Sequence, residues 1–185
     1  MKVITVTIVI IGVIAAFSYF YYSFDFTKIM SELKITSPIF EHNGNISAKY
    51  TCDGGPPAGG INPPLEISGA PEGTKSLALV MDDPAATGGN TWDHWLIWNI
   101  SPRTSAIGEG QAPAGAIFGK TSFGNQKYGG PCPPHGSGAH RYFFKLYALD
   151  AVLDLPAGAG KGELGKAMEG HILGQVELIG LYRRN

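Results

Sequence analysis

Apolar residues along the chain gather in short runs, and each run is closed off by glycine, proline, asparagine or aspartate. Five such runs are rich in β-branched and aromatic residues, and they lie at residues 33–40, 77–83, 94–100, 140–150 and 175–183. Runs of this length and composition between turn-forming residues are typical of β-strands. The pattern therefore predicts a β-rich domain with short strands.

One segment near the C-terminus follows helical spacing instead. Leu164, Ala167, Met168 and Ile172 recur at intervals of three or four residues, which predicts a helix over residues 161–172. Three glycines in this segment weaken its helix propensity. Together with the strand pattern, the segment predicts a mainly β fold, an antiparallel β-sandwich with a C-terminal helix.

The connection over residues 101–139 stands out because it shows little periodicity and holds nine glycines and five prolines. Connections of this length without regular structure are uncommon inside a compact domain, and they tend to be functional or disordered. Phe118, Phe123 and Tyr128 along the connection indicate that it packs against the domain. Its last part, "YGGPCPPHGSGAHRY", is stiffened by proline and leads directly into a predicted strand.

The beginning of the chain has a different character. Residues 3–24 carry no charged side chain, and this length suffices to cross the hydrocarbon core of a bilayer. Aromatic residues crowd the far end, and Lys2 favours an N-terminus inside the cytoplasm. We therefore expect one N-terminal transmembrane helix with the domain outside the cytoplasm. The alternative is a cleaved signal peptide with its apolar core at residues 3–16, which would leave a secreted or periplasmic protein.

These patterns divide the chain into three parts. Residues 1–24 form the expected membrane anchor or signal, residues 25–33 a tether, and residues 34–185 the folded domain. The net charge is −1 and there is no basic stripe. We therefore expect no nucleic-acid partner.

Two cysteines, Cys52 and Cys132, are too few for a four-cysteine zinc site. Outside the cytoplasm they could form one disulfide, and both lie in turn-rich loops. Whether they approach within bonding distance depends on the fold, so the paired and the free states both remain open.

The strand predicted at residues 140–150 begins with groups that could carry chemistry. Strict alternation places His140, Tyr142, Phe144 and Leu146 on one face. An imidazole and a phenol therefore stand above an apolar floor.

Two other predicted strands also bring ionisable side chains to one end. Asp82 and Asp83 close the strand that precedes Pro84. His94 opens the next strand, and alternation groups it with Leu96, Trp98 and Ile100.

If the three strand ends converge, they form a small pocket with two imidazoles, a carboxylate, a phenol and loop N–H groups. Such groups suit a small anion, phosphate or carboxylate. Each feature alone has an ordinary structural explanation, because strand-initial histidines often cap and Asp-Asp-Pro often starts a turn. Their coincidence at strand ends is what favours a binding site.

The same segments resemble the phosphatidylethanolamine-binding protein family, and most closely its prokaryotic Raf-kinase-inhibitor-like branch. The resemblance covers residues 34–183 and rests on "LALVMDDPAA…TWDHWLIWNI", "FGNQKYGGPCPPHGSGAHRYFFKLYALD" and "AMEGHILGQVELIGLYRR". It implies a β-sandwich with a central antiparallel sheet, a C-terminal helix and a small surface pocket for phosphate-like or carboxylate anions. By motif, the ligand-binding residues that it implies are Asp83, His94, Pro134, Gly136, His140 and Tyr142.

One departure from the family pattern affects the pocket. The family commonly reads Asp-Pro-Asp-Ala-Pro where this chain reads "DPAAT". Ala85 therefore replaces the second aspartate, which removes one carboxylate from the expected rim.

The sequence is compatible with three functions. The one we favour is a membrane-tethered or exported binding protein for a small anion or a phospholipid headgroup. The alternative is a protein-interaction module that inhibits a protease or kinase, with a target that no motif identifies. A hydrolase is less favoured. Ser137 could be its nucleophile, but "HGSGA" lacks the Gly-x-Ser-x-Gly pattern. A metal site of His94, His140 and Asp83 is the other catalytic alternative. We expect no enzymatic activity and no cofactor.

Overall fold

The computed structural model describes residues 32–55, 60–86 and 88–185. Contacts divide the chain into two units, residues 1–30 and 31–185, and the described helices and strands all lie in the second. Its elements in chain order are β1 (Lys34–Thr36), β2 (Gly44–Asn45), the 3₁₀ helix η1 (Ala48–Tyr50), β3 (Leu65–Ser68), β4 (Ser76–Asp83), β5 (Trp92–Ile100), β6 (Ala106–Ile107), β7 (Ile117–Phe118), β8 (His140–Leu149), α2 (Lys161–Met168) and β9 (Ile172–Tyr182).

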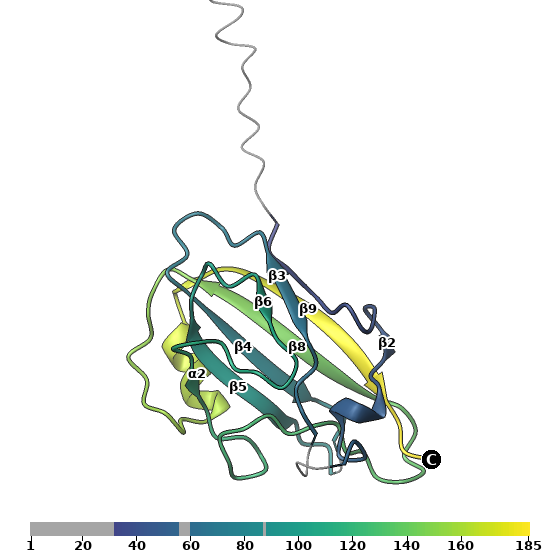
Figure 1. The fold of residues 1–185 in the computed structure, drawn as a ribbon. Coiled ribbons are helices and arrows are strands. Elements are labelled where there is room, and N and C mark those ends of the chain that lie inside the picture. Colours follow the sequence, from purple (N-terminus) through teal and green to yellow (C-terminus); the bar gives the residue numbers. More distant parts are fainter. Residues whose placement is uncertain (1–31, 56–59, 87) are drawn as a thin grey trace, which may run out of the picture. The chain divides into compact units, whose positions relative to one another are not determined.

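The strands form two sheets (Figure 1). A six-stranded sheet has the order β2-β9-β8-β4-β5-β7, and a three-stranded sheet has the order β1-β3-β6. Pairing is antiparallel except between β2 and β9, which run parallel. The long strands β4, β5, β8 and β9 thus make the centre of a mainly β fold.

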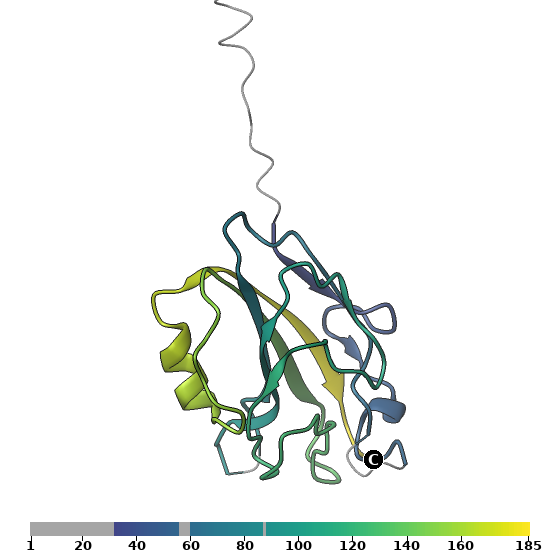
Figure 2. The same ribbon diagram turned by 60° about the vertical axis from the view of Figure 1, so that its left-hand side comes forward.

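The large sheet has a hydrophobic core on each face. One core lies against the small sheet and holds Leu65 and Ile67 of β3 together with Phe144 of β8. The other holds Leu164 and Met168 of α2 with apolar residues of β4 and β5. The sheet is therefore covered on both sides, by the small sheet and by α2 (Figure 2).

The strands predicted at residues 77–83, 94–100, 140–150 and 175–183 and the late helix are confirmed with shifted ends, whereas only Lys34–Thr36 of the run at residues 33–40 forms a strand. The helix ends at Met168 and not at Ile172, because Gly170 adopts a φ of 78° that reverses the chain. Ile172 then begins β9. The connection over residues 101–139 was expected to be ordered, and it contributes the two-residue strands β6 and β7.

The predicted grouping of His94 with Leu96, Trp98 and Ile100 is wrong, because β5 contains two bulges. Met81 pairs with Trp95 but Asp82 pairs with Asp93, which leaves His94 as an extra residue. A second extra residue lies near Asn99, whose φ is 56°. Each bulge reverses the alternation. Leu96 and Trp98 therefore pack under α2, whereas Ile100 packs between the sheets and His94 lines the pocket described below.

The transmembrane helix in the predicted fold class is corrected. In the part of the chain that the structure describes, no helix is long and apolar enough to cross a membrane. The predicted span at residues 3–24 lies outside the described residues. The fold that the described residues support is mainly β with a C-terminal helix.

A buried carboxylate joins α2 to the large sheet. Asp82 is completely buried on the α2 side of β4. Its Oδ2 accepts hydrogen bonds from Lys145 Nζ of β8 at 2.9 Å and from Lys161 Nζ of α2 at 2.5 Å. The lysine side chains are about a third exposed, at 29% and 34%, so water still reaches the two ammonium groups.

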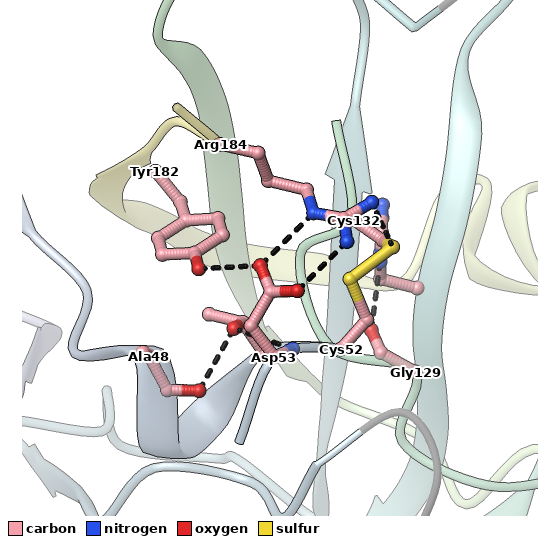
Figure 3. Close-up of a disulfide and its surroundings, with 9 residues drawn as sticks. Ala48, Cys52, Asp53, Gly129, Cys132, Tyr182 and Arg184 are labelled. Carbon is pink, nitrogen blue, oxygen red and sulfur yellow. Dashed lines mark hydrogen bonds and ion pairs between the residues drawn. A yellow bond between two sulfur atoms is a disulfide. The ribbon is translucent and has the colours of Figure 1, made fainter. Parts of the chain in front are cut away.

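A disulfide joins Cys52, after η1, to Cys132 in the loop before β8 (Figure 3). Next to it, the carboxylate of Asp53 accepts two hydrogen bonds from the guanidinium of Arg184, at 3.0 and 2.8 Å, and one from Tyr182 Oη at 2.8 Å. These bonds lower the pKa of Asp53. The disulfide and this cluster together tie two loops to the C-terminal end of β9.

Replacing Asp82 with Asn should destabilise the domain. The substitution leaves two lysines without their carboxylate, and breaking a fully buried pair costs about 3–5 kcal/mol. Because both lysines reach solvent, we expect a smaller loss, about 2 kcal/mol in the free energy of unfolding. Urea denaturation measures it, with Asp154→Asn as the control at an exposed carboxylate. Equal stabilities for the two variants would contradict this role of Asp82.

Replacing both cysteines with serine should also destabilise the domain. The disulfide closes a loop of sequence separation 80, and cross-linking a loop of this size lowers the entropy of the unfolded chain by an equivalent of roughly 4 kcal/mol. We expect a loss of this order in chemical denaturation. The double variant should not respond to reductant, whereas the wild type should lose stability when reduced. A wild type that is indifferent to reductant would contradict the prediction.

Candidate functional site

A pocket of about 280 Å³ opens where β4, β5 and β8 meet the loop before β8. The residues that line it are Asp83, Ala86, Trp92, His94, Phe123, Cys132, Pro133, Pro134, His140 and Tyr142. It is slightly smaller than the roughly 300–1,000 Å³ typical of sites for drug-sized molecules. The pocket therefore suits a small ligand or a small group at the end of a larger one.

A carboxylate–imidazole pair forms one wall. Asp83 is the last residue of β4 and His140 is the first of β8, and both are buried. His140 Nδ1 donates to Asp83 Oδ2 at 2.7 Å, and the backbone N–H of Ala85 donates to Asp83 Oδ1 at 2.9 Å. His140 Nε2 lies 3.1 Å from Ser137 Oγ. Both ring nitrogens of His140 are thus engaged within the protein.

His94 forms a second wall, and it is only 3% exposed. Its Nδ1 donates to the carbonyl oxygen of Gly129 at 2.7 Å. Burial lowers the pKa of the His94 imidazole, while the bond to Gly129 and the charge of Asp83 act in the opposite direction. His94 therefore favours the neutral state in the folded protein.

Tyr142 supplies the floor. Its ring packs edge-on against His94 with the ring centroids 5.2 Å apart. Burial raises the pKa of the phenol and Asp83 adds to that effect, whereas a hydrogen bond with the backbone of Cys132 opposes it. The phenol consequently keeps its proton at neutral pH.

The rim is aromatic and partly exposed. Trp92 and Phe123 are 39% and 42% exposed, and their rings meet edge-to-face at 5.5 Å. Phe123 also packs against His94 at 5.4 Å. Cys132 and Pro133 complete the rim from the disulfide-bonded loop. A ligand would therefore meet polar groups inside and apolar surface at the entrance.

The structure brings together five of the six residues singled out from the sequence. Asp83, His94, Pro134, His140 and Tyr142 all line the pocket. Gly136 does not line it. Gly136 lies on the exposed part of the loop with a φ of 77°, a conformation that favours glycine, and its N–H donates to the carbonyl of Arg184 at 3.4 Å.

Trp92, Phe123 and Ala86 line the pocket without having been selected from the sequence. Trp92 lies two residues before His94, so its place at the strand end could have been noticed. Phe123 was recognised only as a packing residue of the long connection. Ala85 is exposed and lies outside the pocket lining.

A metal site of His94, His140 and Asp83 was one of the sequence alternatives. Within residues 32–55, 60–86 and 88–185, no group of three or more His, Cys, Asp or Glu side chains is placed to hold a metal ion. His140 Nδ1 faces Asp83 in a hydrogen bond, and His94 Nδ1 faces Gly129. The Nδ1 atoms of both histidines are therefore already used in hydrogen bonds within the protein.

The chain is similar to known proteins over most of its length. The sequence model of the phosphatidylethanolamine-binding protein family matches residues 36–183. A UPF0098 protein of Methanothermobacter thermautotrophicus is 48% identical over 157 residues, which cover 82% of this chain and 99% of that protein. A UPF0098 protein of Pyrococcus horikoshii is 48% identical over 158 residues, 82% of this chain and 77% of that protein.

Solved structures agree with these sequence matches. A Chlamydia trachomatis protein described as a putative phosphatidylethanolamine-binding protein homologue is 38% identical with a TM-score of 0.77, over 84% of this chain and 99% of that one. The Escherichia coli protein YbcL, described as a member of the mammalian family, is 29% identical with a TM-score of 0.75, over 83% of this chain and 99% of that one.

The predicted single-pass membrane localisation is corrected together with the transmembrane helix. The described part of the chain contains no helix that could span a membrane. The resemblance seen in the sequence is confirmed by the family match, by the relatives and by the fold. This chain belongs to the phosphatidylethanolamine-binding protein family.

Proposed function

We propose that this protein is a non-enzymatic binding protein whose pocket holds a small anion of the phosphate or carboxylate type. The main support is the convergence of the Asp83–His140 pair, His94 and Tyr142 in one small pocket. Membership in a family named for phosphatidylethanolamine binding supports the same ligand chemistry.

His140 is held at both of its ring nitrogens. Its Nδ1 donates to Asp83 Oδ2 at 2.7 Å, and its Nε2 lies 3.1 Å from Ser137 Oγ. The Ser137 hydroxyl in turn donates to the carbonyl of Pro134 at 2.8 Å. These contacts fix the orientation of the imidazole in the pocket wall.

The overall charge of the pocket limits the ligand. The ten residues that line it include no lysine or arginine. This environment suits an anion of low charge better than a multiply charged one, because there is little fixed positive charge to compensate it.

The same hydrogen bonds argue against catalysis. A serine that acts as a nucleophile gives its proton to the adjacent histidine. Ser137 donates to the carbonyl of Pro134 instead. Inhibition of a protease or kinase, the alternative raised by the sequence, stays a prediction.

The test is a titration of the protein with inorganic phosphate and, separately, with acetate, followed by the ring resonances of His94 and His140. We expect saturable shifts of both histidines. His140→Asn should weaken binding about 10- to 100-fold, because it removes the imidazole that holds the Asp83 carboxylate in the pocket wall, and a hydrogen bond to a charged group contributes about 1.5–3 kcal/mol.

His171→Asn is the matched control, since His171 also pairs with an aspartate, Asp150, but at an exposed site. Tyr142→Phe is a second, isosteric test that keeps His140 in place, with Tyr147→Phe as its control on the other face of β8. Failure of both anions to shift either histidine in the wild type would overturn the proposal.

The stability of the domain should depend on pH through His94. Above pH 6.5, its ordinary pKa, His94 is neutral in the folded and unfolded states and contributes its full stability. As the pH falls from 6.5 to the lowered pKa of the folded state, the unfolded state binds a proton that the folded state does not. The free energy of unfolding then decreases by at most about 1.4 kcal/mol per pH unit.

Denaturation between pH 8 and pH 4.5 measures this decrease. His94→Asn keeps a donor for the carbonyl of Gly129 but cannot titrate, so its stability should fall less steeply below pH 6.5 than that of the wild type. His135→Asn, at an exposed loop position, should keep the slope of the wild type. The same slope in all three proteins would contradict a lowered pKa at His94.

A further inference from the structure

The bulge that places His94 in the pocket also places two carboxylates opposite each other. A ladder without a bulge would pair Asp82 with His94. The structure pairs Asp82 with Asp93 instead and leaves His94 as the extra residue. Directly paired residues present their side chains on the same face of a sheet, so both carboxylates lie on the face that α2 covers.

Lys161, the first residue of α2, lies between these two carboxylates. Its Nζ is 2.5 Å from Asp82 Oδ2 and 3.0 Å from Asp93 Oδ1. Like charges directly opposite each other on two strands are destabilising, and one ammonium group here compensates both. Within residues 32–55, 60–86 and 88–185, no other lysine or arginine forms an ion pair with Asp93. Lys145, the second partner of Asp82, pairs with that carboxylate alone.

The helix that Lys161 begins is fixed against the sheet. Leu164 and Met168, one and two turns further along α2, are buried in the core on this face. At the start of the helix the N–H of Gly160 donates to Glu163 Oε2 at 2.8 Å. The packing of α2 therefore brings the ammonium group to the ends of β4 and β5.

Asp93 connects this ion pair to the pocket on the other face of the sheet. Its N–H donates to Ser122 Oγ at 2.9 Å, and the N–H of Ser122 donates to its carbonyl oxygen at 3.0 Å. Phe123 follows Ser122 and packs edge-on against His94, with the ring centroids 5.4 Å apart. Asp93 is thus linked to α2 by its side chain, to the aromatic rim by its backbone, and to His94 as its neighbour in the chain.

We propose that Lys161 is a positioning residue of the pocket. Its ion pairs with Asp82 and Asp93 hold the bulged end of β5 against β4, and thereby keep His94 and Phe123 in the arrangement that binds the anion. Lys161 itself is not among the residues that line the pocket. This inference rests on the anion-binding function proposed above and adds to it a residue from the opposite face of the sheet.

Loss of the ammonium group acts on the pocket through the strand end. Asp82 and Asp93 then repel each other across the ladder, and the end of β5 moves away from β4. His94 and Phe123 move with it, because one follows Asp93 in the chain and the other is tied to its backbone through Ser122.

The experiment measures inorganic phosphate binding to the full chain by calorimetry and records the ring resonances of His94 with and without phosphate. In Lys161→Met the affinity should fall about 3- to 30-fold, the range for residues that act on a site through others. The His94 resonances should shift already in the ligand-free variant. Lys161→Arg should bind like the wild type, because a guanidinium can also pair with two carboxylates.

Lys145→Met is the matched control, since Lys145 pairs with Asp82 but not with Asp93. It should lose stability, as Lys161→Met does, and yet retain the phosphate affinity and the His94 resonances of the wild type.

Asp93→Asn is a second test that leaves both lysines on the buried Asp82. It should weaken binding by a factor similar to that of Lys161→Met. The double variant of Lys161→Met and Asp93→Asn should bind no more weakly than either single variant, because both changes remove the same contact.

The outcomes separate the two proposals. Wild-type affinity and unshifted His94 resonances in Lys161→Met and Asp93→Asn would overturn the positioning role and leave the anion pocket intact. Equal weakening in Lys161→Met and Lys145→Met would also overturn it, because binding would then follow stability. A wild type that binds no phosphate would overturn the anion-binding function, and the His94 resonances of the ligand-free variants would still decide the role of Lys161.

Discussion

The hydrogen bond between Asp83 and His140 fixes the geometry of the whole site. It joins the last residue of β4 to the first residue of β8 at 2.7 Å, at a place where both side chains are buried. A buried carboxylate that loses its partner is strongly destabilising, so neither residue can be displaced alone. Because β8 continues from His140 in regular alternation, this bond also sets Tyr142 beneath the pocket and opposite His94.

The adjacent residues Asp82 and Asp83 make different contacts, because a strand presents successive side chains on opposite faces. Asp83 points between the sheets and pairs with His140. Asp82 points toward α2 and binds Lys145 and Lys161. The end of β4 is therefore held from both faces of the sheet. A shift of β4 would separate the buried carboxylate of Asp82 from its two lysines, so the position of Asp83 is fixed as well.

The walls of the pocket come from a strand irregularity and from a covalently restrained loop. The bulge in β5 turns His94 onto the face of Tyr142, and the carbonyl of Gly129 then fixes the orientation of its ring by accepting from Nδ1. On the opposite side the disulfide at Cys132 and the contacts of Asp53 hold the rim (Figure 3). The walls of the pocket are thus held by contacts within the protein, and rigid walls of this kind reduce the entropy cost of binding.

The sequence by itself determined the long strands, the late helix and most of the site, because apolar periodicity and the strand-end polar residues are local properties. Alternation correctly placed His140 with Tyr142, since β8 is regular at that end. It misplaced His94, because a bulge arises from the pairing of β5 with β4 and leaves no mark in the sequence of β5 alone. Only the tertiary structure decided that Cys52 meets Cys132, that Trp92 and Phe123 form the rim, and that His94 Nδ1 is bonded to Gly129, since all three depend on contacts between residues far apart in the chain.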